Sequence, residues 1–142
     1  MAIDLTNERL SELSELAAAA REHAYCPYSG FAVGAALLDV NGNIWTGVNI
    51  ENAAYGPTNC AERTAVFKAV SEGVREFLAI AVSGGKAGEE PDALCAPCGI
   101  CRQVLREFCR DDFKIVLGKG EGMKVYTLSE LLPESFSPLN LQ

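Results

Sequence analysis

Two short cysteine-bearing segments, each at the start of a predicted helix, constrain the fold of this chain most. The first spans residues 60–62 (Cys-Ala-Glu) and the second spans residues 97–101 (Pro-Cys-Gly-Ile-Cys). Cys98 and Cys101 are three residues apart, so they lie on one face of the first helical turn. A helix start offers unpaired amides and a partial positive charge, both of which favour thiolates. A fold that brings the two helix starts together can hold one metal ion between Cys60, Cys98 and Cys101.

Zinc suits these ligands because it binds thiolates, and a catalytic zinc keeps three protein ligands and an open fourth position for water. Three thiolates leave the site with a net negative charge, which weakens the activation of that water. We expect Arg63 and Gln103 to donate hydrogen bonds that offset this charge. Glu62 lies two residues from Cys60 and can accept the proton of the water and deliver it to a substrate. The sequence therefore predicts a catalytic Glu62 beside one zinc ion per chain.

Two alternatives exist for these residues. Asn59 and Glu62 have the spacing of a capping box, in which Glu62 would only satisfy the start of a helix. Cys95 offers a fourth thiol, and four protein ligands are typical of a structural zinc site in a non-catalytic binding module. Cys95 precedes Pro97, where the backbone is pushed toward extended geometry, so we favour the three-cysteine site. The two cysteines outside these segments are expected to be small buried apolar residues.

The pattern of apolar residues predicts alternating helices and strands. Helices are expected at residues 4–24, 60–71, 98–109 and 129–132, and strands at residues 31–40, 44–50, 77–83, 113–117 and 124–127. An Asn-Gly pair at residues 41–42 indicates a hairpin, and a polar loop is expected at residues 84–94. This order predicts one α/β domain over residues 1–142, a three-layer α/β/α sandwich with a mixed central sheet of about five strands.

Charge and composition exclude several functional classes. The chain has 19 acidic and 12 basic side chains, a net charge of −7, which argues against a nucleic-acid partner. No apolar run approaches the length of about 18 residues that a membrane helix needs, and the first eight residues lack the pattern of a signal peptide. We therefore expect a cytoplasmic protein with no membrane partner. In such a chain the six cysteines suit a metal site better than disulfides.

Three segments together resemble one known family. They are residues 49–53 (Asn-Ile-Glu-Asn-Ala), 60–64 (Cys-Ala-Glu-Arg-Thr) and 97–103 (Pro-Cys-Gly-Ile-Cys-Arg-Gln). In order and separation they are similar to the small homotetrameric zinc-dependent cytidine deaminases. The resemblance implies hydrolytic deamination of free cytidine and deoxycytidine in pyrimidine salvage, with a zinc-activated hydroxide attacking C4 and a glutamate as proton shuttle. It also implies a homotetramer with one zinc ion per subunit.

The resemblance also implies a set of substrate-binding residues. In the family, the Asn and Glu of the Asn-Ile-Glu segment bind the ribose hydroxyls, and here these are Asn49 and Glu51. Phe31 would pack on the nucleoside, and the amide of Ala61 would meet the pyrimidine carbonyl. Phe136 would close the pocket of a neighbouring subunit, the alternative being a core position in its own subunit. A blasticidin-type deaminase shares the zinc motifs, but the sugar-binding segment argues against that alternative.

Overall fold

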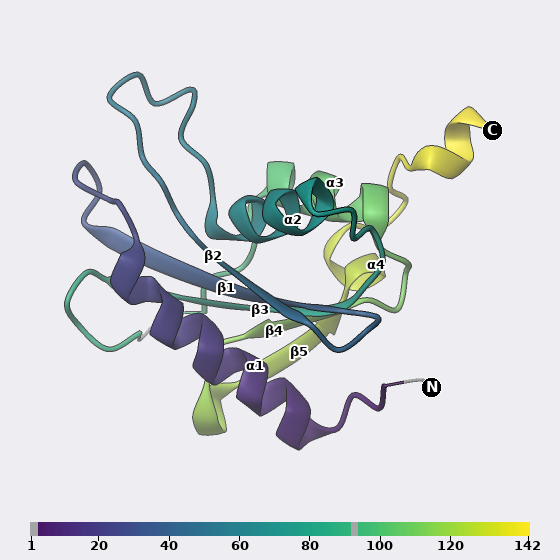
Figure 1. Cartoon of the computed structure of the whole chain (residues 1–142), viewed down its shortest axis with the longest axis horizontal. Coiled ribbons are helices and arrows are strands. Elements are labelled where there is room, and N and C mark those ends of the chain that lie inside the picture. The colour runs from purple at the N-terminus through teal and green to yellow at the C-terminus, as the bar shows by residue number, and fades with distance from the viewer. Residues whose placement is uncertain (1–2, 92–93) are drawn as a thin grey trace.

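A five-stranded mixed sheet organises the chain, as seen in the computed structural model, which describes residues 3–91 and 94–142. The strands lie in the order β2-β1-β3-β4-β5 (Figure 1). Their bounds are Phe31–Asp39 (β1), Ile44–Val48 (β2), Phe77–Lys86 (β3), Lys114–Leu117 (β4) and Lys124–Thr127 (β5). Only β3 and β4 pair in parallel, and the other neighbours are antiparallel. The predicted mixed sheet of about five strands is therefore confirmed.

Helices cover both faces of this sheet (Figure 1). Helix α1 (Asn7–Ala20) packs on one face, whereas α2 (Ala61–Ser71), α3 (Gly99–Phe108) and α4 (Leu128–Leu131) lie on the other. Three short 3₁₀ helices complete the described elements, at Arg21–His23, Gly120–Gly122 and Pro138–Leu141. The three-layer α/β/α sandwich is thus confirmed. Among the described residues, no helix combines the length and the apolar character needed to cross a membrane.

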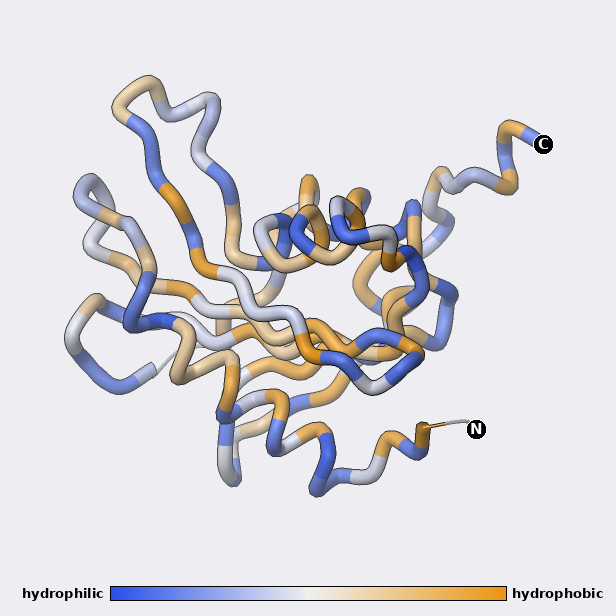
Figure 2. The backbone as a smooth tube through the Cα atoms, viewed as in Figure 1, coloured by the Kyte–Doolittle hydropathy of each residue, from blue (hydrophilic) through white to orange (hydrophobic). Residues whose placement is uncertain are grey.

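The inner strand β1, which lies between β2 and β3, contributes to both layers of the core. Ala35 and Leu37 pack toward α2 and α3, and Ala36 and Leu38 pack toward α1. A strand buried on both faces has a continuous apolar sequence instead of an alternating one, and β1 is buried from its second residue to its last. Figure 2 shows the same distribution, with hydrophobic colour concentrated on the inner strands and hydrophilic colour on the loops.

The hairpin between β1 and β2 is held by a buried carboxylate. Asp39 is fully buried, and its Oδ1 accepts hydrogen bonds from the amides of Asn41 (2.8 Å) and Asn43 (3.0 Å). Its Oδ2 accepts from the indole N–H of Trp45 at 3.0 Å. Burial alone would raise the pKa of Asp39, but these hydrogen bonds outweigh it and hold the pKa below its ordinary value. The predicted Asn-Gly turn is confirmed, with Gly42 at φ +90°.

Several element boundaries differ from those predicted. The first helix begins at Asn7, because the Thr6 side chain caps it, and turns into a 3₁₀ helix after Ala20. Strand β3 continues to Lys86, although a loop was expected from residue 84. Glycine is a poor strand former, but pairing with the start of β1 supplies the hydrogen bonds that extend β3 through Gly84 and Gly85.

Helix α2 lies against β2 at a distance that only glycine permits. A Cβ atom at Gly47 would lie 2.4 Å from the carbonyl oxygen of Ala61 and 2.5 Å from the amide nitrogen of Ala65. Both atoms belong to the backbone of α2, so no side-chain rotation could relieve the contact. The position of the first turn of α2, which follows Cys60, therefore depends on the missing side chain of Gly47.

We expect Gly47→Ala to lower the free energy of unfolding by about 1–3 kcal/mol, because the extra methyl group pushes α2 away from the sheet. Urea denaturation followed by circular dichroism measures this change. Gly122→Ala is the control, since a Cβ at Gly122 meets no atom within 4 Å; it should change stability by less than about 0.5 kcal/mol. Equal effects of the two variants would contradict the close packing of α2 on β2.

Candidate metal centre and active site

The residues singled out by the sequence meet at one end of the strands, where β1 begins and β2 and β3 end. Strand β1 runs antiparallel to both β2 and β3, so the start of β1 lies beside the ends of those two strands. Phe31 is opposite Lys86, and Gly34 is opposite Val48. The chain leaves β2 and β3 at this end, and the two connections that follow lead into α2 and α3. Topology therefore brings both helix starts to the same place, as the cysteine spacing required.

Three cysteine sulfurs meet between these helix starts. The Sγ of Cys98 lies 3.9 Å from the Sγ of Cys60 and 3.6 Å from the Sγ of Cys101, and all three lie within 4.8 Å of one another. Zinc bonds thiolates at about 2.3 Å, so tetrahedral coordination places two sulfurs about 3.8 Å apart. In the described part of the chain, this is the only group of three or more candidate metal ligands. The donor set and its spacing both fit zinc.

At the N-termini of α2 and α3, the sulfurs of Cys60 and Cys98 remain available to bind a metal. Cys60 caps α2 and Cys98 caps α3, and neither side chain makes a capping hydrogen bond. Arg63 donates from Nη2 to the Sγ of Cys60 at 3.3 Å, as predicted. Hydrogen bonds from the thiol of Cys101 and then from Arg63 lower the pKa of Cys60 to about 5, and the donor Cys101 has a raised pKa. Cys60 is therefore held as a thiolate, the form that binds metals.

Glu62 is buried beside this cluster, with 4% of its surface exposed. Burial raises the pKa of Glu62 to about 7, and the negative charge of Cys60 adds to the effect. A carboxyl group with this pKa can take up and release a proton near neutral pH. The capping-box alternative is wrong, because α2 is capped by Cys60 and the Asn59 side chain instead donates to Thr64 at 3.0 Å.

Cys95 lies near the three sulfurs but outside their group. Its side chain packs over Gly84 at the end of β3, and burial raises the pKa of Cys95 to about 11. Three protein ligands leave a fourth zinc position open, which favours a catalytic site over a structural one. Of the two cysteines expected to be buried, Cys109 is buried and Cys26 is only half-buried.

Asn49 and Phe31 are joined at the start of β1. The side chain of Asn49 accepts a hydrogen bond from the amide of Val33 (2.9 Å) and donates one to the carbonyl of Phe31 (2.8 Å). Asn49 thereby continues the pairing of β2 with β1 beyond the last residue of β2. An amide group has two N–H donors and two acceptor lone pairs, so one of each remains free for a ligand.

Glu51 holds the turn that precedes β1. Its carboxylate accepts hydrogen bonds from the amides of Tyr28 (2.9 Å) and Ser29 (3.1 Å) and from the Ser29 hydroxyl. The Ser29 hydroxyl contributes most to holding the pKa of Glu51 below its ordinary value, so Glu51 is ionised at neutral pH. A cavity of about 360 Å³ opens beside it, lined also by Tyr55 and Thr58.

The aromatic residues of this cavity were missed by the sequence analysis. The rings of Tyr28 and Tyr55 meet edge to face with centroids 6.0 Å apart. Tyr55 has a φ of +64°, unusual for a residue with a side chain, and it lies in the connection between β2 and α2. Nothing in the sequence positions of Tyr28 and Tyr55 indicated that their rings would meet beside the Glu51 carboxylate.

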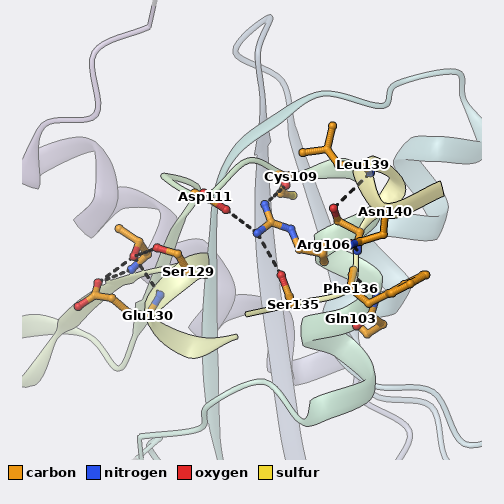
Figure 3. A network of polar contacts seen from close by, with 12 residues as sticks. Gln103, Arg106, Cys109, Asp111, Ser129, Glu130, Ser135, Phe136, Leu139 and Asn140 are labelled. Atoms are coloured by element: carbon orange, nitrogen blue, oxygen red, sulfur yellow. Dashed lines mark hydrogen bonds and ion pairs between the residues drawn. The ribbon is translucent and has the colours of Figure 1, made fainter. Parts of the chain in front are cut away.

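Gln103 does not make the contact that was expected of it. Its side-chain amide donates to the carbonyl oxygen of Phe136 at 2.9 Å, and no hydrogen bond to a sulfur is found for it in the described residues (Figure 3). A backbone carbonyl accepts hydrogen bonds better than a thiol does, so the C-terminal segment captures this donor. The sequence offered no sign that this segment would lie along α3. Phe136 itself is 59% exposed, so it is not a core residue of its own chain.

Two arginines of α3 anchor neighbouring segments. Arg102 donates to the carbonyls of Pro97 and Leu131, both at 2.7 Å. Arg106, which is buried, donates to the carboxylate of Asp111 at 2.6 Å and to the carbonyl of Cys109 at 2.7 Å (Figure 3). The helix that carries two of the three cysteines therefore also holds α4 and the chain that follows it.

Comparison with known proteins agrees with this geometry. Residues 7–117 match the family described as the cytidine and deoxycytidylate deaminase zinc-binding region. The chain belongs to the cytidine deaminase family. A cytidine deaminase of Halalkalibacterium halodurans is 55% identical over 83% of this chain and 86% of its own length. A probable cytidine deaminase of Dictyostelium discoideum is 44% identical over 96% of this chain and 90% of its own length.

Solved structures of this deaminase family share the fold. The crystal structure of a cytidine deaminase from Burkholderia pseudomallei is 45% identical, covers 93% of this chain and 100% of its own, and superposes with a TM-score of 0.77. A blasticidin-S deaminase of Bacillus cereus is also similar, at 32% identity over 74% of this chain and 76% of its own length. The chain is therefore a hydrolytic deaminase by family.

We expect Cys60→Ser, Cys98→Ser and Cys101→Ser each to lose zinc, because each variant removes one thiolate from the three-sulfur group. Cys95→Ser is the matched control and should retain about one zinc per chain, since catalytic sites use three protein ligands. Native mass spectrometry or inductively coupled plasma analysis of the purified variants measures this content. Loss of zinc from Cys95→Ser with retention in Cys101→Ser would contradict the assignment and favour a structural zinc site.

Proposed function

We propose that this protein hydrolyses free cytidine and deoxycytidine to uridine and deoxyuridine, releasing ammonia. The observation that carries the proposal is the buried Glu62 beside three sulfurs spaced for a single zinc ion. The names of the relatives, cytidine deaminases at up to 55% identity, support the same substrate class. Conversion of cytosine nucleosides to uracil nucleosides for reuse in pyrimidine salvage is the role that this reaction would serve.

The residues of this site divide the work of the reaction. When bound by Cys60, Cys98 and Cys101, one zinc ion per chain supplies a Lewis acid that lowers the pKa of water. Glu62 removes one proton from the attacking water and delivers it to N3 of the pyrimidine. It then moves the second proton of that water, from the new hydroxyl group at C4, to the amine as the C4–N bond breaks and ammonia leaves. The pKa of Glu62, near 7, suits a group that must both accept and donate.

The remaining contacts hold the nucleoside in place. The amide of Ala61 belongs to the first turn of α2, where it has no partner within the helix and can donate to the pyrimidine carbonyl. Phe31, partly exposed at the start of β1, packs on the nucleoside. Asn49 and Glu51 bind the sugar hydroxyls, Asn49 through the hydrogen-bonding capacity left free by its contacts to β1. The net charge of −7 supports a small neutral substrate over a nucleic acid.

We further propose a homotetramer in which Phe136 closes the pocket of a neighbouring subunit. The C-terminal residues extend away from the rest of the chain (Figure 1). Phe136, Leu139 and Leu141 are 59%, 76% and 79% exposed, and exposed apolar side chains of this kind favour contact with another protein surface. We assign the protein to the cytoplasm, where its six free thiols would remain reduced.

An ultraviolet assay across cytidine, deoxycytidine, cytosine, CMP and blasticidin S tests the function. We expect the two nucleosides to be turned over with the highest kcat/KM, because cytosine has no sugar for Asn49 and Glu51 to bind and CMP adds a negative charge that this acidic chain disfavours. Fastest turnover of cytosine or CMP would overturn the substrate assignment. Fastest turnover of blasticidin S would favour the second candidate function, a blasticidin-type deaminase, which the relative at 32% identity supports.

Glu62→Gln should retain zinc and stability but lose at least about 100-fold in kcat, the lower range of what general acid–base catalysis contributes. Glutamine keeps the size of the side chain and removes its ability to carry a proton. The matched control is Glu72→Gln, which removes an exposed carboxylate from the other end of α2 and should leave kcat unchanged. If Glu62→Gln kept more than about a tenth of the wild-type kcat, Glu62 would not be the proton carrier.

Light scattering should give the mass of a tetramer, and a mixing experiment tests the shared pocket. Phe136→Ala subunits keep Glu62, and Glu62→Gln subunits keep Phe136. Hybrids formed by unfolding and refolding the two together should therefore regain activity at sites that carry neither change. Each variant refolded alone is the control and should stay impaired. A fully active monomer would contradict the shared site.

A further inference from the structure

The side chains of Cys95 and Phe31 pack over Gly84, beside the active site. A Cβ atom at Gly84 would lie 2.8 Å from the Sγ and 2.9 Å from the Cβ of Cys95, and 3.0 Å from Cε2 of Phe31. Real Cβ atoms essentially never approach other atoms under 3.0 Å, so the two side chains occupy the space that any larger residue would need. Cys95 and Phe31 therefore lie side by side on the end of β3.

This pair lies on the same face of the sheet as the cysteine cluster. Val82, two residues before Gly84 on β3, packs into the core layer under α2 and α3, and Cys95 packs against the same layer. The charge of Glu62 acts on the thiol of Cys95, which agrees with a short separation between the two groups. Cys95 and Phe31 therefore lie on the face of the sheet that α2 and Glu62 cover.

The chemistry of the substrate indicates which part of it meets this wall. The N3 and O2 edge of cytosine needs polar partners, which Glu62 and the amide of Ala61 supply, and N1 carries the sugar. The remaining edge, C5 and C6, is apolar and requires an apolar neighbour. Phe31 and the thiol of Cys95 are apolar groups on the face of the sheet that carries the site, since a neutral cysteine behaves as a small hydrophobic residue.

We propose that Cys95, seated on Gly84, forms the wall against the C5 edge of the pyrimidine and determines which 5-substituted cytosine nucleosides the site accepts. This inference rests on the proposed function. A smaller residue at position 95 opens space for a 5-methyl group. A side chain at position 84 pushes Cys95 toward the substrate and closes that space.

The next residue of β3 supplies a matched control. A Cβ atom at Gly85 would also be crowded, at 3.0 Å from the Cα of Pro91 and 3.2 Å from Arg21, but successive side chains of a strand point to opposite faces. Gly85→Ala therefore crowds the same strand, less tightly than Gly84→Ala, without moving Cys95. A role that was only structural would make Gly84→Ala and Gly85→Ala behave alike.

The experiment measures kcat/KM for cytidine and for 5-methylcytidine in wild type, Cys95→Ala, Gly84→Ala and Gly85→Ala. The 5-methyl compound is also assayed as a competitive inhibitor of cytidine turnover, so that a slow substrate still yields a selectivity ratio. We expect the ratio of 5-methylcytidine to cytidine to rise about tenfold in Cys95→Ala and to fall about tenfold in Gly84→Ala, the lower range for one methyl group in an apolar pocket. In Gly85→Ala the ratio should stay within about twofold of wild type.

The outcomes separate this inference from the function on which it rests. Wild type that turns over cytidine, with an unchanged ratio in Cys95→Ala and Gly84→Ala, would overturn the inference alone. Equal shifts in Gly84→Ala and Gly85→Ala would also overturn it. Wild type that turns over neither nucleoside would overturn the proposed function and this inference together. Cys95→Ala changes no packed backbone, so it keeps the test decisive even if Gly84→Ala fails to fold.

Discussion

The meeting of two helix starts is the constraint on which the rest of this structure depends. The first turns of α2 and α3 bring their unpaired amides and the sulfurs of Cys60, Cys98 and Cys101 together, and the sheet decides whether the two turns can meet. Because β1 is antiparallel to both of its neighbours, the ends of β2 and β3 fall at one edge, and both connections depart from there. The chemistry of the site is therefore a consequence of strand order as much as of cysteine spacing.

The parts of the site that the sequence predicted are those in which residue type and local spacing decide the outcome. Cys98 and Cys101 share a helical turn by their spacing, and Arg63 reaches Cys60 because both lie in the first turn of one helix. Likewise, the continuous apolar run of β1 and the Asn-Gly turn after it predict the first hairpin of the sheet without further information.

The parts that could not be predicted depend on segments distant in the chain. Gln103 donates to Phe136 because the C-terminal segment lies along α3, and no local pattern announces that contact. Gly84 was assigned to a polar loop because the residues after it are rich in Gly and Glu, whereas pairing with β1 makes it part of β3. Asn59 and Glu62 had the spacing of a cap, but Cys60 already occupied the capping position.

Helix α3 also connects the metal ligands to the C-terminal segment. Its first turn carries two of the three sulfurs, and its following turns hold the segment that includes Phe136 through Gln103 and Arg106. One rigid element thus spans from the metal ligands to the outermost apolar residues. In an assembly where Phe136 enters the next copy, a copy that loses its metal would also loosen the pocket of its neighbour. The metal content of one copy would then affect the active site of the next.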